Sequence, residues 1–317
     1  MGPGSPRRED DRRSRRRRGR LGRPRRRGLG APRVSEALFR LAHLDLAPDR
    51  LGEWLRRWGA DGTLRRIEAG ALGSRGRGAS VVGVSNEARR RELARLGIDF
   101  VTLPVPDHER LGRLGVAPTG PWWLFLRGTV PEGPAVAVVG TRTCTAYGRT
   151  LARAYGRALA EAGWTVVSGL ARGIDAAAHR GVVEAGGRGI AVVGCGLDVP
   201  YPRANVGLAR DLVAAGGAVV SEYPPGTRPH PGRFPARNRI LVELADAVVV
   251  VETGVRGGSM LTVAHALDLG VPVFAVPGDV DRSTSRGCNL LLRDGAHPVL
   301  DPDDLVAELS VLPLADR

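Results

Sequence analysis

The feature that most constrains the fold is a repeated alternation of short apolar runs with amphipathic segments, which begins at Ala135. Short valine-rich runs are typical of strands buried on both faces, and helices between them allow neighbouring strands to run parallel. The alternation predicts an α/β fold with a doubly wound, mostly parallel sheet. The predicted strands are residues 135–139, 165–168, 190–193, 218–221, 247–251 and 273–276.

Each predicted strand runs into small or polar residues, and ligands of open α/β sheets bind at this carboxyl edge. The first strand ends in Gly140, Thr141 and Arg142 before a predicted helix, so backbone N–H groups and the helix dipole would face a ligand there. We therefore predict an anion site that contains Arg142. A dinucleotide-binding loop would need a glycine where Arg142 stands, so we expect no NAD.

Two further turns are expected at the same edge. Ser168 and Gly169 end the second strand and lead to Arg172, which we expect beside Arg142. The turn after the fifth strand opens another helix and offers a second phosphate cradle at Gly257, Gly258 and Ser259. Between these turns, residues 224–239 form a long proline-rich segment, and a loop of that length is usually functional or mobile.

Asp175 and His179 stand four residues apart in the helix expected after Arg172. They are open to two interpretations, an acid/base pair or a helix cap and a packing residue. We favour the structural interpretation, because capping and packing explain both residues more simply.

The net charge of +14 is concentrated at the amino terminus. Residues 1–33 hold 14 arginines and three acidic residues, which gives 14 − 3 = +11 and leaves 14 − 11 = +3 for the remainder. Bulk charge therefore does not argue for nucleic-acid binding by the fold, and the argument rests on where individual arginines stand. Aromatic residues are scarce at 4%, so base stacking would depend on the few rings near the motifs, which are Tyr147, Tyr201, Tyr223 and Phe234.

Several classes of protein are disfavoured by composition. Cys144, Cys195 and Cys288 lie far apart without a CxxC pair, and the six histidines lack metal-ligand spacing, so we expect neither disulfides nor a metal. No apolar run approaches the length of a membrane span, and the amino terminus lacks a signal peptide. We therefore expect a cytoplasmic protein.

The chain is expected to divide into four parts. Residues 1–33 are low-complexity Arg, Gly and Pro and are predicted to be disordered, either as a basic arm for DNA or as a dispensable tail. Apolar residues at helical spacing over 34–70 predict a small helical module, followed by strands at 81–84 and 100–103 around a helix at 87–96. The expected boundaries are 34–119 for this module and its connector, 120–311 for the sheet domain and 312–317 for a short tail.

The ordered set of motifs over residues 93–309 resembles the DprA (Smf) family of DNA-processing proteins. The motifs are GTRTCTAYG, SGLARGIDAAAH, GCGLDVPYPRAN, SEYPPG, FPARNR, GGSMLTVAHA, VFAVPG and SRGCNLLLRDGA. The resemblance implies an extended Rossmann-like domain that binds single-stranded DNA, forms a homodimer around residues 289–299 and loads the RecA recombinase in natural transformation. It implies no catalytic turnover and no cofactor. It also implies that Arg142, Arg172, Arg237 and Asn238 contact DNA.

Two departures from the family pattern limit what the resemblance implies. The amino-terminal module resembles a sterile-alpha or helix-hairpin-helix unit, but the glycines of its hairpin are absent near residues 46–48, so we expect a packing role there. Many members also carry a carboxyl-terminal winged-helix domain, for which we find no sequence after the helix expected at 302–309.

Two other functions remain in view. The first is an enzyme similar to the nucleotide phosphoribohydrolases, which need a glutamate in the helix after a Gly-Gly turn. The corresponding segment from Gly257 to His265 contains no carboxylate, although Glu222 and Glu252 are placed at the strand edge. The second is a purely structural interaction protein, which would not bind single-stranded oligonucleotides.

Overall fold

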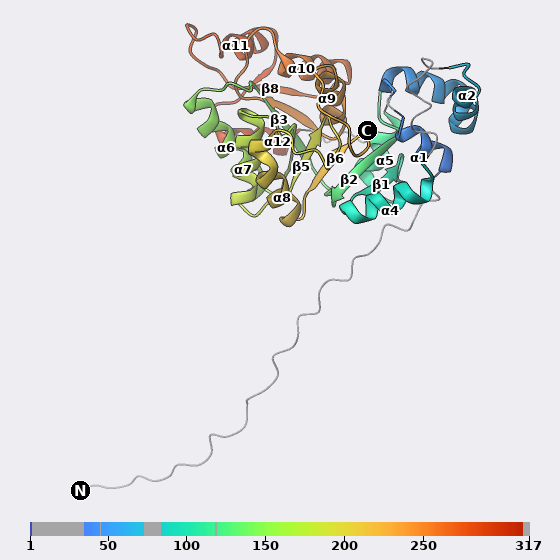
Figure 1. Ribbon diagram of the computed structural model, residues 1–317. Coiled ribbons are helices and arrows are strands. Elements are labelled where there is room, and N and C mark those ends of the chain that lie inside the picture. The colour runs from blue at the N-terminus through green and yellow to red at the C-terminus, as the bar shows by residue number, and fades with distance from the viewer. Residues whose placement is uncertain (2–34, 45, 73–83, 118, 313–317) are drawn as a thin grey trace. The chain divides into compact units, whose positions relative to one another are not determined.

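The computed structural model describes Met1 and residues 35–44, 46–72, 84–117 and 119–312 (Figure 1). Within these residues, nine strands form one sheet in the order β1-β2-β6-β5-β4-β3-β7-β8-β9. The strands from β6 to β9 in this order pair in parallel, whereas β2 and β1 add an antiparallel edge. The predicted Rossmann-like, mostly parallel α/β sheet is confirmed.

All six strands predicted from the valine-rich runs are present, and the one predicted at 100–103 corresponds to β1. The strands are β1 Asp99–Thr102, β2 Trp123–Gly128, β3 Ala135–Val139, β4 Thr165–Ser168, β5 Gly189–Val193, β6 Ala218–Ser221, β7 Ala247–Val250, β8 Val273–Ala275 and β9 His297–Pro298.

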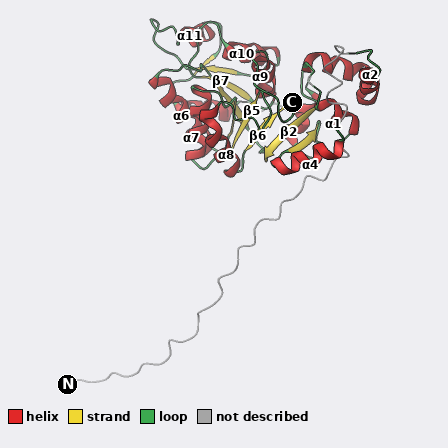
Figure 2. Cartoon of the chain, in the orientation of Figure 1, coloured by secondary structure: helices red, strands yellow, loops and turns green. Residues whose placement is uncertain are grey.

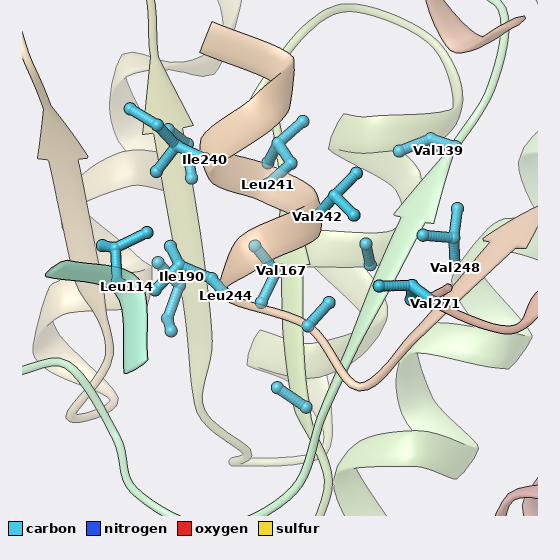
Figure 3. Close-up of a cluster of buried hydrophobic side chains, with 14 of the residues drawn as sticks. Leu114, Val139, Val167, Ile190, Ile240, Leu241, Val242, Leu244, Val248 and Val271 are labelled. Atoms are coloured by element: carbon cyan, nitrogen blue, oxygen red, sulfur yellow. The ribbon is translucent and has the colours of Figure 1, made fainter. Parts of the chain in front are cut away.

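Helices cover both faces of the sheet (Figure 2). Alternate residues of β3 point to opposite faces: Ala137 belongs to one buried cluster and Val138 to the other. The first cluster packs the strands against α5 Glu109–Val116, α9 Arg233–Glu243, α10 Gly258–Asp268 and α11 Arg286–Arg293, and Figure 3 shows part of it, with Ile240 and Leu241 of α9. The second packs them against α6 Ala146–Glu161, α7 Ile174–Glu184, α8 Val206–Ala214 and α12 Pro302–Val311, and the short 3-10 helix η1 Arg203–Asn205 precedes α8.

The amino-terminal helices are α1 Glu36–Ala42, α2 Pro48–Glu68 and α4 Asn86–Leu96, which fits the helical pattern of the sequence. They share a buried cluster with Trp123 and Phe125 of β2. Because β1 comes from the expected module and pairs with β2, the sheet continues across the boundary expected at residue 119, and the four-part division stays a prediction. The helical backbone of α2 breaks at Gly59 (φ 65°, ψ 178°), so a glycine turn does occur in this module, later in the chain than 46–48.

Some expectations fall outside the described residues. They are the Arg-rich segment 1–33, the strand at 81–84 except Val84, and the end of the tail at 313–317.

The strand order reverses at the centre of the sheet, between β3 and β7. The chain moves outward from β3 through β4 and β5 to β6, then returns to the other side of β3 as β7. The loops after β3 and β7 therefore leave in opposite directions, which creates the crevice where open α/β sheets bind ligands. The segments beginning at Gly140 and Glu252 meet at this crevice, where the Thr141 N–H donates to the Glu252 carbonyl at 2.7 Å.

The close crossing of α6 and α7 predicts a strong effect for one small substitution. A Cβ at Gly181 would overlap the backbone carbonyl of Arg153, and backbone cannot move aside as a side chain can. Gly181→Ala is expected to destabilise the protein by about 1–3 kcal/mol. Gly207→Ala is the control, because a Cβ there meets nothing within 4 Å and alanine favours the helix, so its stability should be unchanged or up to about 1 kcal/mol higher. Denaturant unfolding of both variants checks this, and equal stabilities would contradict it.

Candidate nucleic-acid interface

A pocket of about 660 Å³ opens at the crevice between β3 and β7. It is lined by the ends of these strands, the first turns of α9 and α10, and part of the loop before α9. Eight of the residues predicted from sequence line it, namely Gly140, Thr141, Arg142, Arg237, Asn238, Gly257, Gly258 and Ser259.

A smaller pocket of about 230 Å³ adjoins the first and shares Arg142, Phe234 and Arg237 with it. Gly169 and Arg172 also line it, so the structure brings Arg172 and Arg142 to one pocket. Ser168 lines neither pocket. Its buried hydroxyl donates to the Val138 carbonyl at 2.6 Å and ties β4 to β3.

Arg142 is exposed at the turn after β3, and its guanidinium carbon lies 4.9 Å from the centroid of the Phe234 ring. In the described part of the chain, no ion pair involves Arg142. Two carboxylates that follow strands of the sheet, Glu222 and Asp175, accept hydrogen bonds from other groups. Glu222 receives two hydrogen bonds from Arg239 at 2.6 and 2.7 Å, and Asp175 receives the backbone N–H groups of Gly169 and Ala171.

Asp175 organises the turn that carries Arg172. The prediction that Asp175 caps α7 is wrong, because the N-cap is Gly173 and the Asp175 carboxylate instead accepts from Gly169 (3.1 Å) and Ala171 (3.4 Å), before the helix. Burial raises the pKa of Asp175, while Arg237 and these two amides act in the opposite direction.

Arg237 lies beneath the pockets, largely buried, with its guanidinium donating to the Val192 carbonyl. Burial lowers its pKa to about 10, and Asp175 partly offsets this, so Arg237 stays positively charged at neutral pH. A Cβ at Gly169 would overlap this guanidinium and lie 2.6 Å from Asp175 Oδ2, so the absence of a side chain leaves room for both charged groups.

His179 does not form an acid/base pair with Asp175. The imidazole is completely buried, and burial lowers its pKa to about 4, so it is neutral at physiological pH. It lines none of the pockets at this edge, which agrees with a packing role.

The turn between β7 and α10 is held by Asn238 and Ser259, both of which are largely buried. The Asn238 side chain donates to the Gly258 carbonyl at 3.0 Å, and the Ser259 and Thr253 hydroxyls are 2.6 Å apart. No side chain caps the amino terminus of α10, and a Cβ at Gly257 or Gly258 would meet nothing within 4 Å. The first amides of α10 therefore face open space beside Arg256, an exposed residue of the same pocket.

Of the four rings near the motifs, Tyr201 and Phe234 line the pockets. Their ring centroids are 5.6 Å apart and the rings are stacked, so Phe234 contacts both the Tyr201 ring and the Arg142 guanidinium. Tyr223 is buried, and Tyr147 is exposed outside the pockets. The sequence contained these rings, but only the fold distinguishes the stacked pair from the other two.

The groups lining this edge suit an anion with planar substituents. Among the described lining residues of the two pockets, Asp175 is the one carboxylate, and it is buried against Arg237 and backbone amides. The rest of this edge presents exposed cations, open helix amides and ring faces. The fold and this edge together define a Rossmann-like α/β protein with an arginine-lined crevice at its topological switch point.

Comparison with known proteins gives the family. The model of the DNA recombination-mediator protein A family matches residues 108–310. The chain therefore belongs to this family. It is 40% identical over 224 residues to protein Smf of Synechocystis, covering 69% of this chain and 56% of that protein. It is 48% identical over 172 residues to a putative DNA processing protein DprA of Mycobacterium tuberculosis, covering 54% of this chain and 44% of that protein.

Solved structures agree with this assignment. DprA from Streptococcus pneumoniae matches with a TM-score of 0.66 at 31% identity, covering 86% of this chain and 96% of that one. DprA from Helicobacter pylori, a structure described for its single-stranded DNA binding mode, matches with a TM-score of 0.58 at 28% identity, covering 67% of this chain and 96% of that one. The chain spans about half the length of the first curated relatives that it matches.

Among the described residues, no helix is both long and apolar enough to cross a membrane. No three His, Cys, Asp or Glu side chains among them are grouped as metal ligands would be.

Proposed function

We propose that this chain binds single-stranded DNA along the carboxyl edge of its sheet and acts in DNA recombination, including the processing of strands taken up in natural transformation. The observation that carries the proposal is the combination, at one crevice, of two exposed arginines, open helix amides and stacked rings. Arg142 and Arg256 supply charge for phosphates, and the amino terminus of α10 supplies N–H donors.

The rings support a preference for single strands. Tyr201 is 40% exposed and stacks on Phe234, so a planar surface is available at the groove. Bases can stack on such a surface only when they are unpaired, and stacking tolerates every base. The contacts we expect are arginines and helix amides to phosphates, which carry no sequence information, so we expect little sequence specificity.

The alternative of a phosphoribohydrolase-like enzyme has less support from the site. Glu222 is paired with Arg239, and Glu252 accepts the Thr145 N–H at 2.9 Å. Neither carboxylate lines the two pockets. Asp175 does line the larger pocket, so an assay for free base released from nucleoside monophosphates is the direct test of this alternative.

Two partners belong to the same proposal. A RecA-type recombinase would receive the bound strand, and a second copy of this chain would pack against the region 289–299. Leu291 is buried and Leu292 packs on the core, so only Leu290 of the three consecutive leucines is left for a dimer contact. The sequence argument for that contact is therefore weaker. We expect a dimer mass in light scattering at micromolar concentration, and a strictly monomeric mass would contradict the dimer.

Arg142→Ala tests the DNA site. Wild-type protein should bind a single-stranded oligonucleotide more tightly than a duplex of the same length. Removing the charge that neutralises one phosphate should weaken single-strand binding similarly for all sequences and reduce the slope of log K against log salt by about 0.7. Affinities at several salt concentrations and the thermal midpoint are measured together.

Arg188→Ala is the matched control for Arg142→Ala, because Arg188 is also exposed and lines none of the pockets at this edge. The control should bind as wild type. Unchanged affinity of Arg142→Ala with an intact fold would remove Arg142 from the site, and equal or tighter duplex binding by the wild type would contradict the proposed function.

A further inference from the structure

Helix α9 is held to the end of β6 by two contacts beside the proposed DNA site. Glu222, the first residue after β6, accepts two hydrogen bonds from Arg239 of α9, at 2.6 and 2.7 Å. The next residue, Tyr223, lies against Arg233 at the start of α9, with 5.1 Å between the ring centroid and the guanidinium carbon. Arg237, which lines the larger pocket, stands between these two contacts on the helix. The contacts with β6 therefore help to fix the site residues of α9.

A second carboxylate, that of Glu243, stands one helical turn after Arg239 on α9. The Thr119 hydroxyl donates to Glu243 Oε1 at 2.6 Å, whereas the buried Oε2 has no hydrogen-bond partner among the described residues. The same is true of the buried Nη1 of Arg239. Residues four apart on a helix are neighbours, and an unmade hydrogen bond costs free energy when its donor or acceptor is buried. Oε2 and Nη1 are thus an acceptor and a donor that could meet.

The surroundings of Glu243 let it exchange a proton near neutral pH. Burial raises the pKa of Glu243 to about 7, against the opposing effects of the Thr119 hydrogen bond and the charge of Arg239. The charge of Glu222 adds to the rise. Glu243 therefore changes between a neutral and a charged acceptor within the physiological range.

Other charged groups on the elements packed against α9 have separate roles. On α5, Arg113 is paired with Asp246 at 3.0 Å, and Arg110 donates to backbone carbonyls. The ionisable residues of α10 are His265 and Asp268, and neither is among the groups that shift the pKa of Glu243. Strand β5 carries no charged residue. The charges that act on this carboxyl are those of the Glu222–Arg239 ion pair.

We propose that Glu243 is a proton switch that sets how firmly Arg239 holds α9 to the end of β6, and thereby the affinity of the site for single-stranded DNA. With the proton bound, the Arg239 guanidinium is engaged with Glu222. When the proton leaves, the Glu243 carboxylate becomes a charged acceptor for Arg239 Nη1. Two carboxylates that repel each other then share one guanidinium, so the contact with β6 weakens and α9 is less preorganised for a phosphate. The inference rests on the proposed function.

Proton binding and DNA binding favour the same state of α9, so each must strengthen the other. Affinity for single strands should be highest with Glu243 protonated and should fall as the pH rises through about 7. We expect a decrease of about three- to tenfold between about pH 6 and pH 8, which corresponds to a rise of about half to one in the pKa of Glu243 on DNA binding. Binding near pH 7 should take up protons.

Glu243→Gln is the principal test, because glutamine resembles the protonated carboxyl and cannot ionise. Affinity for an oligothymidylate of about 16 nucleotides is measured across this pH range at constant ionic strength. Calorimetry in buffers of different ionisation enthalpy gives the number of protons taken up, and thermal midpoints confirm folding. Glu243→Gln should keep its low-pH affinity at pH 8 and take up fewer protons than wild type. Glu161→Gln, which removes an exposed carboxylate of α6, should retain the wild-type profile.

Thr119→Val tests the same switch by moving its midpoint. The Thr119 hydrogen bond lowers the pKa of Glu243, so its loss should shift the decrease in affinity to higher pH. A variant with the wild-type midpoint would contradict this. His230, in the loop before α9, is unchanged in every protein compared, so its contribution to pH dependence cancels.

The outcomes separate the switch from the function on which it rests. If Arg142→Ala weakens binding but Glu243→Gln follows the wild-type pH profile and proton uptake, the switch is wrong and the proposed function stands. A wild-type affinity that does not change with pH would also overturn the switch. If wild-type protein binds no single strands at any pH, the proposed function is wrong and the switch is wrong with it.

Discussion

Replacing Arg239 with methionine is expected to destabilise the fold by about 3–5 kcal/mol, because the change removes one member of a buried, hydrogen-bonded ion pair with Glu222. The two side chains are only 7% and 9% exposed, and one guanidinium nitrogen donates to both carboxylate oxygens. Burial acts to lower the pKa of Arg239, but the charges of Glu222 and Glu243 outweigh it and raise the pKa, so Arg239 is positively charged in the folded protein. Chemical and thermal unfolding of Arg239→Met measure the loss.

A double variant distinguishes the effect of the broken pair from that of altered packing. Glu222→Leu with Arg239→Met removes both charges and keeps apolar volume, so it should recover much of the stability lost in Arg239→Met alone. A double variant as unstable as the single one would show that packing, not the uncompensated charge, dominates. Arg239 lies on α9 two residues after Arg237, so the pair also helps to hold a helix that lines the proposed DNA site.

Glu243→Gln is expected to make the protein more stable at pH 8 and to change it little at pH 4.5. Burial raises the pKa of Glu243 from 4.5 to about 7, and the nearby Glu222 acts in the same direction. The Thr119 hydroxyl donates to one carboxyl oxygen at 2.6 Å, while the other has no partner among the described residues.

The direction in which stability changes with pH follows from proton binding to Glu243. Between pH 4.5 and about 7 the folded protein holds a proton on Glu243 that the unfolded chain has released. The contribution of this carboxyl to stability is therefore present below pH 4.5 and is lost as the pH rises through about 7. The loss amounts to about 3 kcal/mol, and glutamine avoids it because it does not ionise.

Free energies of unfolding from pH 4.5 to pH 8 check this, with Glu161→Gln as the control. Glu161 is exposed on α6, so its variant should show the pH dependence of the wild type. A Glu243→Gln variant whose stability follows the wild-type curve at every pH would contradict the prediction.

The sheet was predictable because its signal is local. A strand buried on both faces needs a continuous apolar run, and each of the six runs from residue 135 onward forms a strand. The placement of Arg142 followed from the same pattern, since a residue directly after a parallel strand must lie at the carboxyl edge. The motifs likewise indicated the family before any geometry was known, and the family model confirms it.

Predictions for single polar side chains were less accurate, for a physical reason. Ser168 and Asp175 stand beside glycine-rich turns, where sequence permits capping, ligand binding or packing. Their hydrogen bonds run to Val138 and to the amides of Gly169 and Ala171, and such partners depend on how strands and turns meet. The stacked Tyr201 and Phe234 belong to segments 33 residues apart, so no local pattern could pair them.

By itself, the sequence determined seven of the nine strands, with β2 and β9 missed, and it placed Arg142 and Arg172 at the carboxyl edge of the sheet, because strand periodicity and chain order act locally. Only the tertiary structure decided which of those arginines remain available to bind a ligand. Glu222 reaches Arg239 across 17 residues, and Glu252 reaches the Thr145 amide across 107, so these carboxylates are satisfied by partners that the fold supplies. Electrostatic interactions act through space, and Arg142 has no ion pair among the described residues because of where distant segments meet.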